Sequence, residues 1–109
     1  MMWRIEFLEE AEKDLKKLDS SAQIQVLKGL RKVSQNPLPA EEGGYGKPLG
    51  NKSGENLTNL MKIKLRGLGI RIVYKVERIN DVMKIIIISA RADGQVYKEA
   101  AKRREKHHL

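Results

Sequence analysis

Cysteine is absent from this chain of 109 residues, and histidine occurs only twice, at positions 107 and 108. The lack of cysteine excludes disulfides, thiolate catalysis and cysteine-based zinc sites. The two histidines lie at the end of the chain without a partner acid or a spaced third ligand, so they do not predict a metal site. We therefore expect the protein to work without a metal or another cofactor.

Long hydrophobic runs are also missing. No stretch approaches the ~18–20 apolar residues that a membrane-spanning helix needs. The segment Met1–Phe7 lacks the long apolar stretch and small-residue cleavage site of a signal peptide. We expect a cytoplasmic protein with no membrane partner, folded as one domain over residues 1–109, because a chain of this length supports a single core.

Acidic residues are fewer than basic residues. The chain has 22 Lys and Arg against 14 Asp and Glu, a formal net charge of +8. Such an excess favours a polyanionic partner, nucleic acid first and an acidic protein second. Solubility alone is the alternative explanation of the charge.

The first third of the chain predicts one strand and two helices. Apolar residues alternate over positions 3–7, which is the period of a half-buried strand, and from Glu9 the period becomes helical. Asp19, Ser20 and Ser21 interrupt the pattern and offer an N-cap for a second helix, which ends near Ser34–Asn36, before Pro37. The apolar stripe of the second helix consists of Ala22, Val26, Leu27, Leu30 and Val33, with Ile24 at its edge.

The remainder predicts a loop, three strands and a helix. Residues 37–58 are rich in glycine and proline and have no periodicity, which is typical of a loop. Strands are expected over 60–66 and 70–74, joined by a glycine-bearing hairpin, and over 82–89, where four consecutive isoleucines indicate a central strand. A last helix follows Asp93–Gly94. The order βααβββα predicts an α+β sandwich, a mostly antiparallel sheet with helices on one face and part of the other face free to bind.

One face of the strand over 60–66 carries three cations. Because side chains alternate along a strand, Lys62, Lys64 and Arg66 point the same way. Like charges in a row repel one another, so this face must meet solvent or an anion. A phosphodiester backbone is the anion that best matches a row of cations.

Several stretches, in order and at matching spacing, resemble the RelE-like toxins of bacterial and archaeal toxin–antitoxin pairs. They are Lys62–Arg66, Gly69–Tyr74, Ile88–Ser89 with Arg91 just after, and Val96–Tyr97 leading into Ala100. The resemblance implies the RelE-like fold and a metal-independent endoribonuclease that enters the ribosomal A site and cuts the mRNA there. The long glycine-rich loop departs most from the family.

The resemblance also implies site residues. The catalytic positions carried over are Lys62, Lys64, Arg71, Arg91 and Tyr97. We further expect RNA or ribosome contacts from the following cations: Arg66, Lys102, Arg103 and Arg104. The implied partners are a cognate antitoxin protein, the ribosome and mRNA, and the resemblance allows the toxin–antitoxin complex to bind its own operator DNA.

Metal-free cleavage of RNA uses the ribose 2′-OH as nucleophile and leaves a 2′,3′-cyclic phosphate and a 5′-OH. It needs a base for the 2′-OH proton and stabilisation of charge on phosphorus and on the leaving oxygen. Crowding by other cations favours a neutral lysine, so Lys64 or Lys62 is our candidate base. Arg71 is expected to clamp the phosphorane and Arg91 to stabilise the leaving oxygen, while Tyr97 stacks on a base or orients the 2′-OH.

Two other function classes remain open on sequence alone. A ParE-like toxin would bind DNA gyrase without catalysis, but the full cationic set argues for RNA. A simple RNA-binding module would use paired stacking aromatics, whereas only Tyr97 offers an obvious stacking surface.

Overall fold

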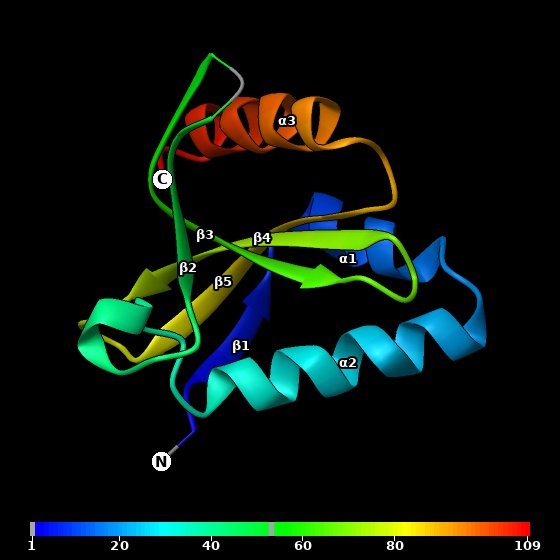
Figure 1. Cartoon of the computed structure of the whole chain (residues 1–109), viewed down its shortest axis with the longest axis horizontal. Helices are drawn as coiled ribbons and strands as arrows, with labels where there is room; N and C mark the ends of the chain where they lie inside the picture. Colours follow the sequence, from blue (N-terminus) through cyan, green and yellow to red (C-terminus); the bar gives the residue numbers. More distant parts are fainter. Residues whose placement is uncertain (1, 53) are drawn as a thin grey trace.

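The computed structural model describes residues 2–52 and 54–109 as five strands, three α-helices and one short 3₁₀ helix (Figure 1). In chain order they are β1 (Arg4–Phe7), α1 (Glu9–Lys16), α2 (Ser20–Ser34), η1 (Ala40–Glu42), β2 (Lys47–Lys52), β3 (Glu55–Leu65), β4 (Ile70–Glu77), β5 (Val82–Ser89) and α3 (Asp93–Lys106). No helix in this described part of the chain is both long enough and apolar enough to cross a membrane.

The strands form one sheet in the order β1-β5-β4-β3-β2. Only the β1–β5 pair is parallel, and the other three pairs are antiparallel. The predicted α+β class with a mostly antiparallel sheet is therefore confirmed. The prediction of a central strand at the isoleucine run is also confirmed, because β5 lies between β1 and β4 and Ile85–Ile88 are all buried.

The prediction that all helices share one face of the sheet is wrong. Adjacent residues of β3 point to opposite faces, and Leu65 contacts α2, where it lies 3.2 Å from the position of a Cβ at Gly29. Lys64, pointing the other way, contacts Asp93 at the start of α3. Helices α2 and α3 therefore cover opposite faces, and Figure 1 shows the sheet between them.

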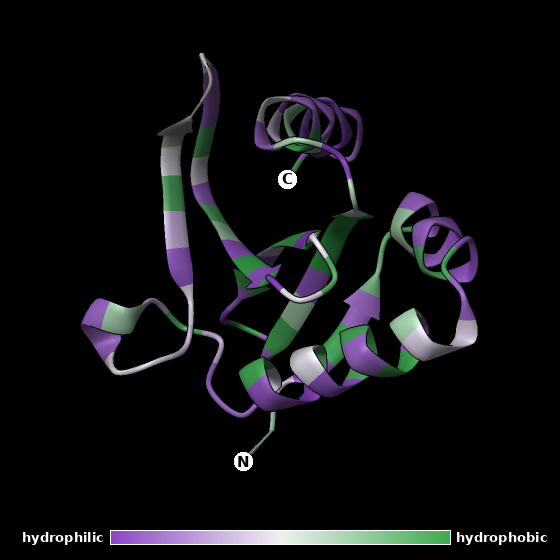
Figure 2. Ribbon diagram, turned by 45° about the vertical axis from the view of Figure 1, so that its right-hand side comes forward, coloured by the Kyte–Doolittle hydropathy of each residue, from purple (hydrophilic) through white to green (hydrophobic). Residues whose placement is uncertain are grey.

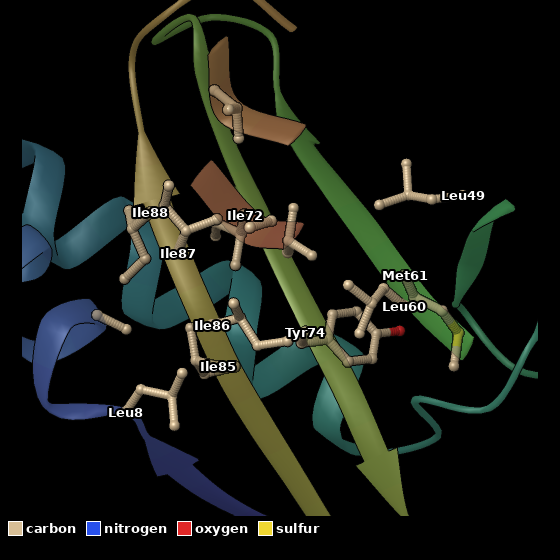
Figure 3. Packing of buried hydrophobic residues seen from close by; sticks show 14 of the residues in the cluster. Leu8, Leu49, Leu60, Met61, Ile72, Tyr74, Ile85, Ile86, Ile87 and Ile88 are labelled. Carbon is tan, nitrogen blue, oxygen red and sulfur yellow. The ribbon is translucent and has the colours of Figure 1, made fainter. Parts of the chain in front are cut away.

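The core is densest around β4 and β5. Figure 2 shows hydrophobic residues along β5 and hydrophilic residues over most of α3, whose buried residues are Val96, Tyr97 and Ala100. Figure 3 places Tyr74 among the isoleucines of the central strands. Tyr74 is fully buried, and its hydroxyl donates to the carbonyl of Pro37 at 2.9 Å. This bond satisfies the buried hydroxyl and anchors the start of the 37–58 segment to the core.

The prediction that 37–58 is a loop is wrong over its second half. Strand β2 occupies Lys47–Lys52, and β3 begins at Glu55, several residues earlier than expected. β2 is an edge strand that pairs only with β3, and its register shifts between Pro48 and Gly50. Proline and glycine are tolerated at the edge of a sheet and at a bulge, which is why their presence concealed this strand.

Helix α2 largely follows its predicted boundaries. The Asp19 side chain accepts a hydrogen bond from the Ala22 backbone N–H at 2.8 Å, and the helix ends at Ser34. The predicted stripe is correct for Val26, Leu30 and Val33, but Leu27 is 46% exposed and lies outside the core. Ile24, expected at the edge of the stripe, is also exposed.

A mostly buried ion pair lies at the edge of β5 that β1 leaves uncovered. Beyond Ile85 the short strand β1 no longer covers this edge, and Arg103 of α3 donates to the carbonyl of Ile86 at 2.9 Å. Asp14 of α1 accepts from the Ile88 N–H at 3.1 Å and from Arg103 at 2.7 Å. The side chains of Arg103 and Asp14 are 12% and 14% exposed. The pair therefore joins α1 and α3 through the edge of the central strand.

Removing one partner of this pair is expected to destabilise the fold. We predict that Arg103→Leu lowers the free energy of unfolding by about 2–3 kcal/mol, slightly below the ~3–5 kcal/mol typical of a fully buried pair. Urea unfolding followed by circular dichroism measures the change. Lys102→Leu, an exposed position on the same helix, is the matched control and should change stability by less than ~0.5 kcal/mol. Equal effects of the two substitutions would contradict a structural role of the pair.

Candidate active site

The paired strands β3 and β4 bring the first predicted cations together. Lys64 lies directly opposite Arg71 in the antiparallel register, and Lys62 lies opposite Val73. Residues opposite one another in a sheet point to the same face, so Lys62, Lys64 and Arg71 share the face that α3 crosses. The predicted alternation of the cations on β3 is therefore present in the fold.

Asp93, which the sequence analysis did not select, is the acid at the centre of this cluster. Its carboxylate accepts a hydrogen bond from the Arg71 Nε and another from the Lys64 Nζ, the latter at 3.4 Å. Partial burial would raise the pKa of Asp93, but the hydrogen bonds from Arg71 and Lys64 outweigh it and hold that pKa below its ordinary value. Asp93 is therefore an anion at neutral pH, and its side chain is 41% exposed.

Arg71 also ties two loops to the site. Besides Asp93, its Nη1 donates to the carbonyl of Gly69 at 3.3 Å and to the carbonyl of Arg91 at 3.0 Å. Gly69 has a φ of +66°, a conformation that glycine adopts at little cost, and it closes the β3–β4 hairpin. One guanidinium thus links the hairpin turn, the β5–α3 connection and the first residue of α3.

Arg66 and Arg91 lie at the margins of the cluster. Arg66 follows the last residue of β3, is exposed, and borders a depression of about 250 Å³ together with Lys64, Gly69 and Arg71. Arg91 is exposed in the β5–α3 connection, and its backbone N–H donates to the Ser89 hydroxyl at 3.1 Å. Both guanidinium groups can therefore reach an anion that enters from solvent.

Tyr97 occupies a different environment from the one expected. It is only 3% exposed, so its ring does not offer a free face on which a base can stack. Burial raises the pKa of its hydroxyl, and the charge of the nearby Asp93 adds to the rise. The phenol consequently stays protonated at neutral pH, and a role in positioning fits it better than stacking.

β2 adds a cation that the sequence analysis placed in a loop. Lys47 lies directly opposite Lys62 in the β2–β3 register and is exposed. Like charges opposite one another in a sheet are unfavourable unless an anion or solvent screens them. The cationic face therefore extends from β4 across β3 to the edge strand.

The cations predicted at the end of α3 lie apart from this cluster. Lys102 is exposed, but Arg103 belongs to the buried pair with Asp14, so its expected RNA contact does not fit its position. Arg104 lies about 16 Å along the helix from Asp93, at ~1.5 Å per residue. His107, expected to lack a partner, contacts the carboxylate of Glu10 at 2.9 Å.

Known proteins resemble this chain over nearly its whole length, although no protein-family model matches it. The sequence is 33% identical over 103 residues to the mRNA interferase toxin RelE of Escherichia coli strain K12, covering 94% of this chain and 98% of that protein. A putative RelE-like toxin protein of Escherichia coli is 30% identical over 104 residues, again covering 94% and 98%.

Solved structures agree with the sequence relatives. The free state of a doubly substituted E. coli toxin RelE superposes with a TM-score of 0.70 at 31% identity, covering 94% of this chain and 98% of that chain. The toxin in the intact E. coli RelBE toxin–antitoxin complex superposes with a TM-score of 0.63 at 29% identity, covering 83% and 98%. Fold and sequence therefore point to one and the same set of proteins.

Proposed function

Because the chain belongs to the RelE family of toxins, we propose that it is the toxin of a toxin–antitoxin pair and an endoribonuclease that cuts messenger RNA. The sequence relatives named mRNA interferase and the solved toxin–antitoxin complexes support this reading. We further propose that cleavage occurs in the ribosomal A site and that the ribose 2′-OH is the nucleophile.

The observation that carries the proposal is the anion held between Lys64 and Arg71. In the free protein this anion is the Asp93 carboxylate. A phosphodiester has the same charge and similarly spaced oxygens, and arginine binds such groups with two N–H donors in a fixed geometry. The depression bordered by Lys64, Arg66 and Arg71 lies beside these donors and is open to an anion that enters from solvent.

The proposed reaction removes a proton from the 2′-OH, delivers one to the 5′-oxygen and exchanges one bond on phosphorus. A lysine, Lys64 or Lys62, accepts the 2′-OH proton while the 2′-oxygen forms a bond to phosphorus. Arg71 stabilises the extra negative charge of the phosphorane, and the bond to the 5′-oxygen then breaks. Arg91 stabilises that leaving oxygen, which takes its proton from solvent or from the protonated base. The products are a 2′,3′-cyclic phosphate and a 5′-OH.

The ribosome and an antitoxin are the proposed partners. The net charge of +8 and the exposed cations Lys47, Arg66 and Lys102 provide an electrostatic surface for ribosomal RNA. An active toxin must be silenced, so we propose an acidic or amphipathic antitoxin segment that folds over the basic face. The complex of the two proteins would be the species that binds operator DNA.

The test is cleavage of a defined mRNA on stalled ribosomes. Purified protein is added to ribosomes stopped with an empty A site, and cut positions are mapped by primer extension. We expect cuts confined to the A-site codon, a 5′-OH on the downstream fragment and a 2′,3′-cyclic phosphate on the upstream one.

The same protein should arrest translation when it is expressed alone in cells. Arg31→Ala, an exposed α2 cation far from the cluster on the opposite face, is a matched control that should cleave like the unmodified chain. Intact mRNA on stalled ribosomes, together with normal growth at high soluble expression, would contradict the proposed function.

A further inference from the structure

We propose that Asp93 is a specificity-determining residue, an internal competitor that occupies the phosphodiester position and thereby favours cleavage of RNA presented by the ribosome over cleavage of free RNA. This inference rests on the proposed function, because it assigns a substrate preference to the same site. The ligand that would bind in place of the Asp93 carboxylate is a single RNA phosphodiester.

The Asp93 carboxylate and a bound phosphate would compete for the same hydrogen-bond donors. Its two oxygens are divided between the two cations, Oδ1 on Arg71 and Oδ2 on Lys64. These are the same donors that the proposed reaction assigns to the scissile phosphate. A phosphate cannot take both donors while the carboxylate keeps them, so binding requires Asp93 to move away or to share them.

Nothing in the position of Asp93 prevents that movement. It is the first residue of α3, and its side chain is 41% exposed. The preceding residue, Ala92, caps the helix without a side-chain hydrogen bond, so the fold of α3 does not depend on Asp93 as its N-cap. Partly exposed ion pairs of this kind are weak and exchange readily with another anion.

The competition explains why the source of the RNA matters. A free oligonucleotide competes with a carboxylate that is covalently attached to the protein and therefore always present next to the cations. An mRNA held in the A site while the protein is bound to the ribosome has the same advantage, because its phosphate is also confined close to the site. The attached carboxylate thus weakens the binding of free RNA more than the binding of the RNA that the ribosome holds in place.

The experiment compares Asp93→Asn with the unmodified chain on two substrates. Asparagine has the same shape but no charge, so it leaves Lys64 and Arg71 without their anion. The first measurement is the affinity for a short oligoribonucleotide with one 2′-deoxy sugar, which prevents cleavage. We expect Asp93→Asn to bind it about twofold to fivefold more tightly, the scale of one partly exposed ion pair.

The second measurement is the cleavage rate of the corresponding all-ribose oligonucleotide relative to mRNA on stalled ribosomes. Asp93→Asn should raise this ratio by about the same factor, since only the free substrate is limited by the competition. Asp93→Glu keeps the carboxylate and should behave like the unmodified chain.

Glu105→Gln serves as the matched control for charge. It removes one exposed acid from the other end of α3 and raises the net charge by the same amount. A gain in affinity equal to that of Asp93→Asn would reduce the effect to net charge and overturn the inference. Weaker RNA binding by Asp93→Asn would also overturn it, because Asp93 would then be holding Lys64 and Arg71 in place.

Failure of the proposed function gives a different result. If the unmodified protein leaves mRNA on stalled ribosomes intact, the proposed nuclease is wrong whatever Asp93→Asn does. If it cuts ribosomal mRNA while Asp93→Asn changes neither the affinity nor the ratio, the nuclease stands and the competition by Asp93 is wrong.

Discussion

Replacement of both Lys62 and Lys64 by arginine is expected to lower cleavage on stalled ribosomes by ~10² or more, the usual scale for loss of a general base. Arginine keeps the two positive charges and can keep the contact with Asp93, but its pKa above ~12 prevents it from accepting a proton from the 2′-OH. Binding to ribosomes should therefore remain nearly unchanged. Single-turnover cleavage rates and ribosome co-sedimentation measure the two quantities separately.

The single variants Lys62→Arg and Lys64→Arg identify which lysine acts as the base. Lys28→Arg combined with Lys32→Arg is the matched control, because both lysines are exposed on α2, which covers the opposite face of the sheet. If the Lys62 and Lys64 double variant cleaves at the rate of the unmodified protein, the two lysines contribute only positive charge and neither is the base. Tyr97 would then be a poor substitute, since burial raises its pKa, and the base would be a group of the ribosome.

The sequence predicted best those elements whose residues are buried on both sides. Strand β5 requires apolar residues on both faces, so the run Ile85–Ile88 identified it without any knowledge of its neighbours. Strand β2 offered no such pattern, because an edge strand tolerates proline and glycine. Its position became evident only through its pairing with β3, which brings Lys47 beside Lys62.

The arrangement of helices and ion pairs could not be predicted for a related reason. Which face of the sheet α3 crosses depends on the path of the β5–α3 connection, and periodicity within α3 does not specify that path. In the sequence, Arg103 resembles a solvated cation near a helix end. In the fold it donates to the carbonyl of Ile86 at the edge of β5 and forms a mostly buried ion pair with Asp14. This contact exists because β1 ends opposite Ile85 and leaves the following residues of β5 without a neighbouring strand on that side.

Part of the candidate site could be predicted from a strand pattern, and part depends on contacts that only the fold creates. The alternation on β3 was sufficient to place Lys62 and Lys64 on one face, and their catalytic roles stay predictions. Asp93 lies 29 positions from Lys64 and 22 from Arg71, so only the fold reveals their contact. One signal was available in the sequence, since Asp93 is the only acid between Asp81 and Glu99 and follows Arg91 by two residues.

Arg71→Ala is expected to reduce the rate of the chemical step by ~10²–10³, the cost of removing one preorganised donor from a developing oxyanion. Binding to ribosomes should weaken much less, because Arg71 is one cation among many and its largest contribution is to the phosphorane. Single-turnover cleavage at saturating protein isolates the chemical step from binding. Arg31→Ala is again the matched control, an arginine lost from the opposite face.

The structure requires one further measurement, because Arg71 also donates to the carbonyls of Gly69 and Arg91. Truncation therefore loosens the hairpin and the β5–α3 connection as well as the site, so thermal unfolding must be recorded for each variant. Arg71→Lys retains the charge but lacks the planar fork that reaches Asp93 and the two carbonyls together. If the fork aligns the phosphate, Arg71→Lys should cleave only slightly faster than Arg71→Ala. Cleavage by Arg71→Lys at the unmodified rate would show that charge alone is sufficient, and the proposed alignment of the phosphorane by Arg71 would then be wrong.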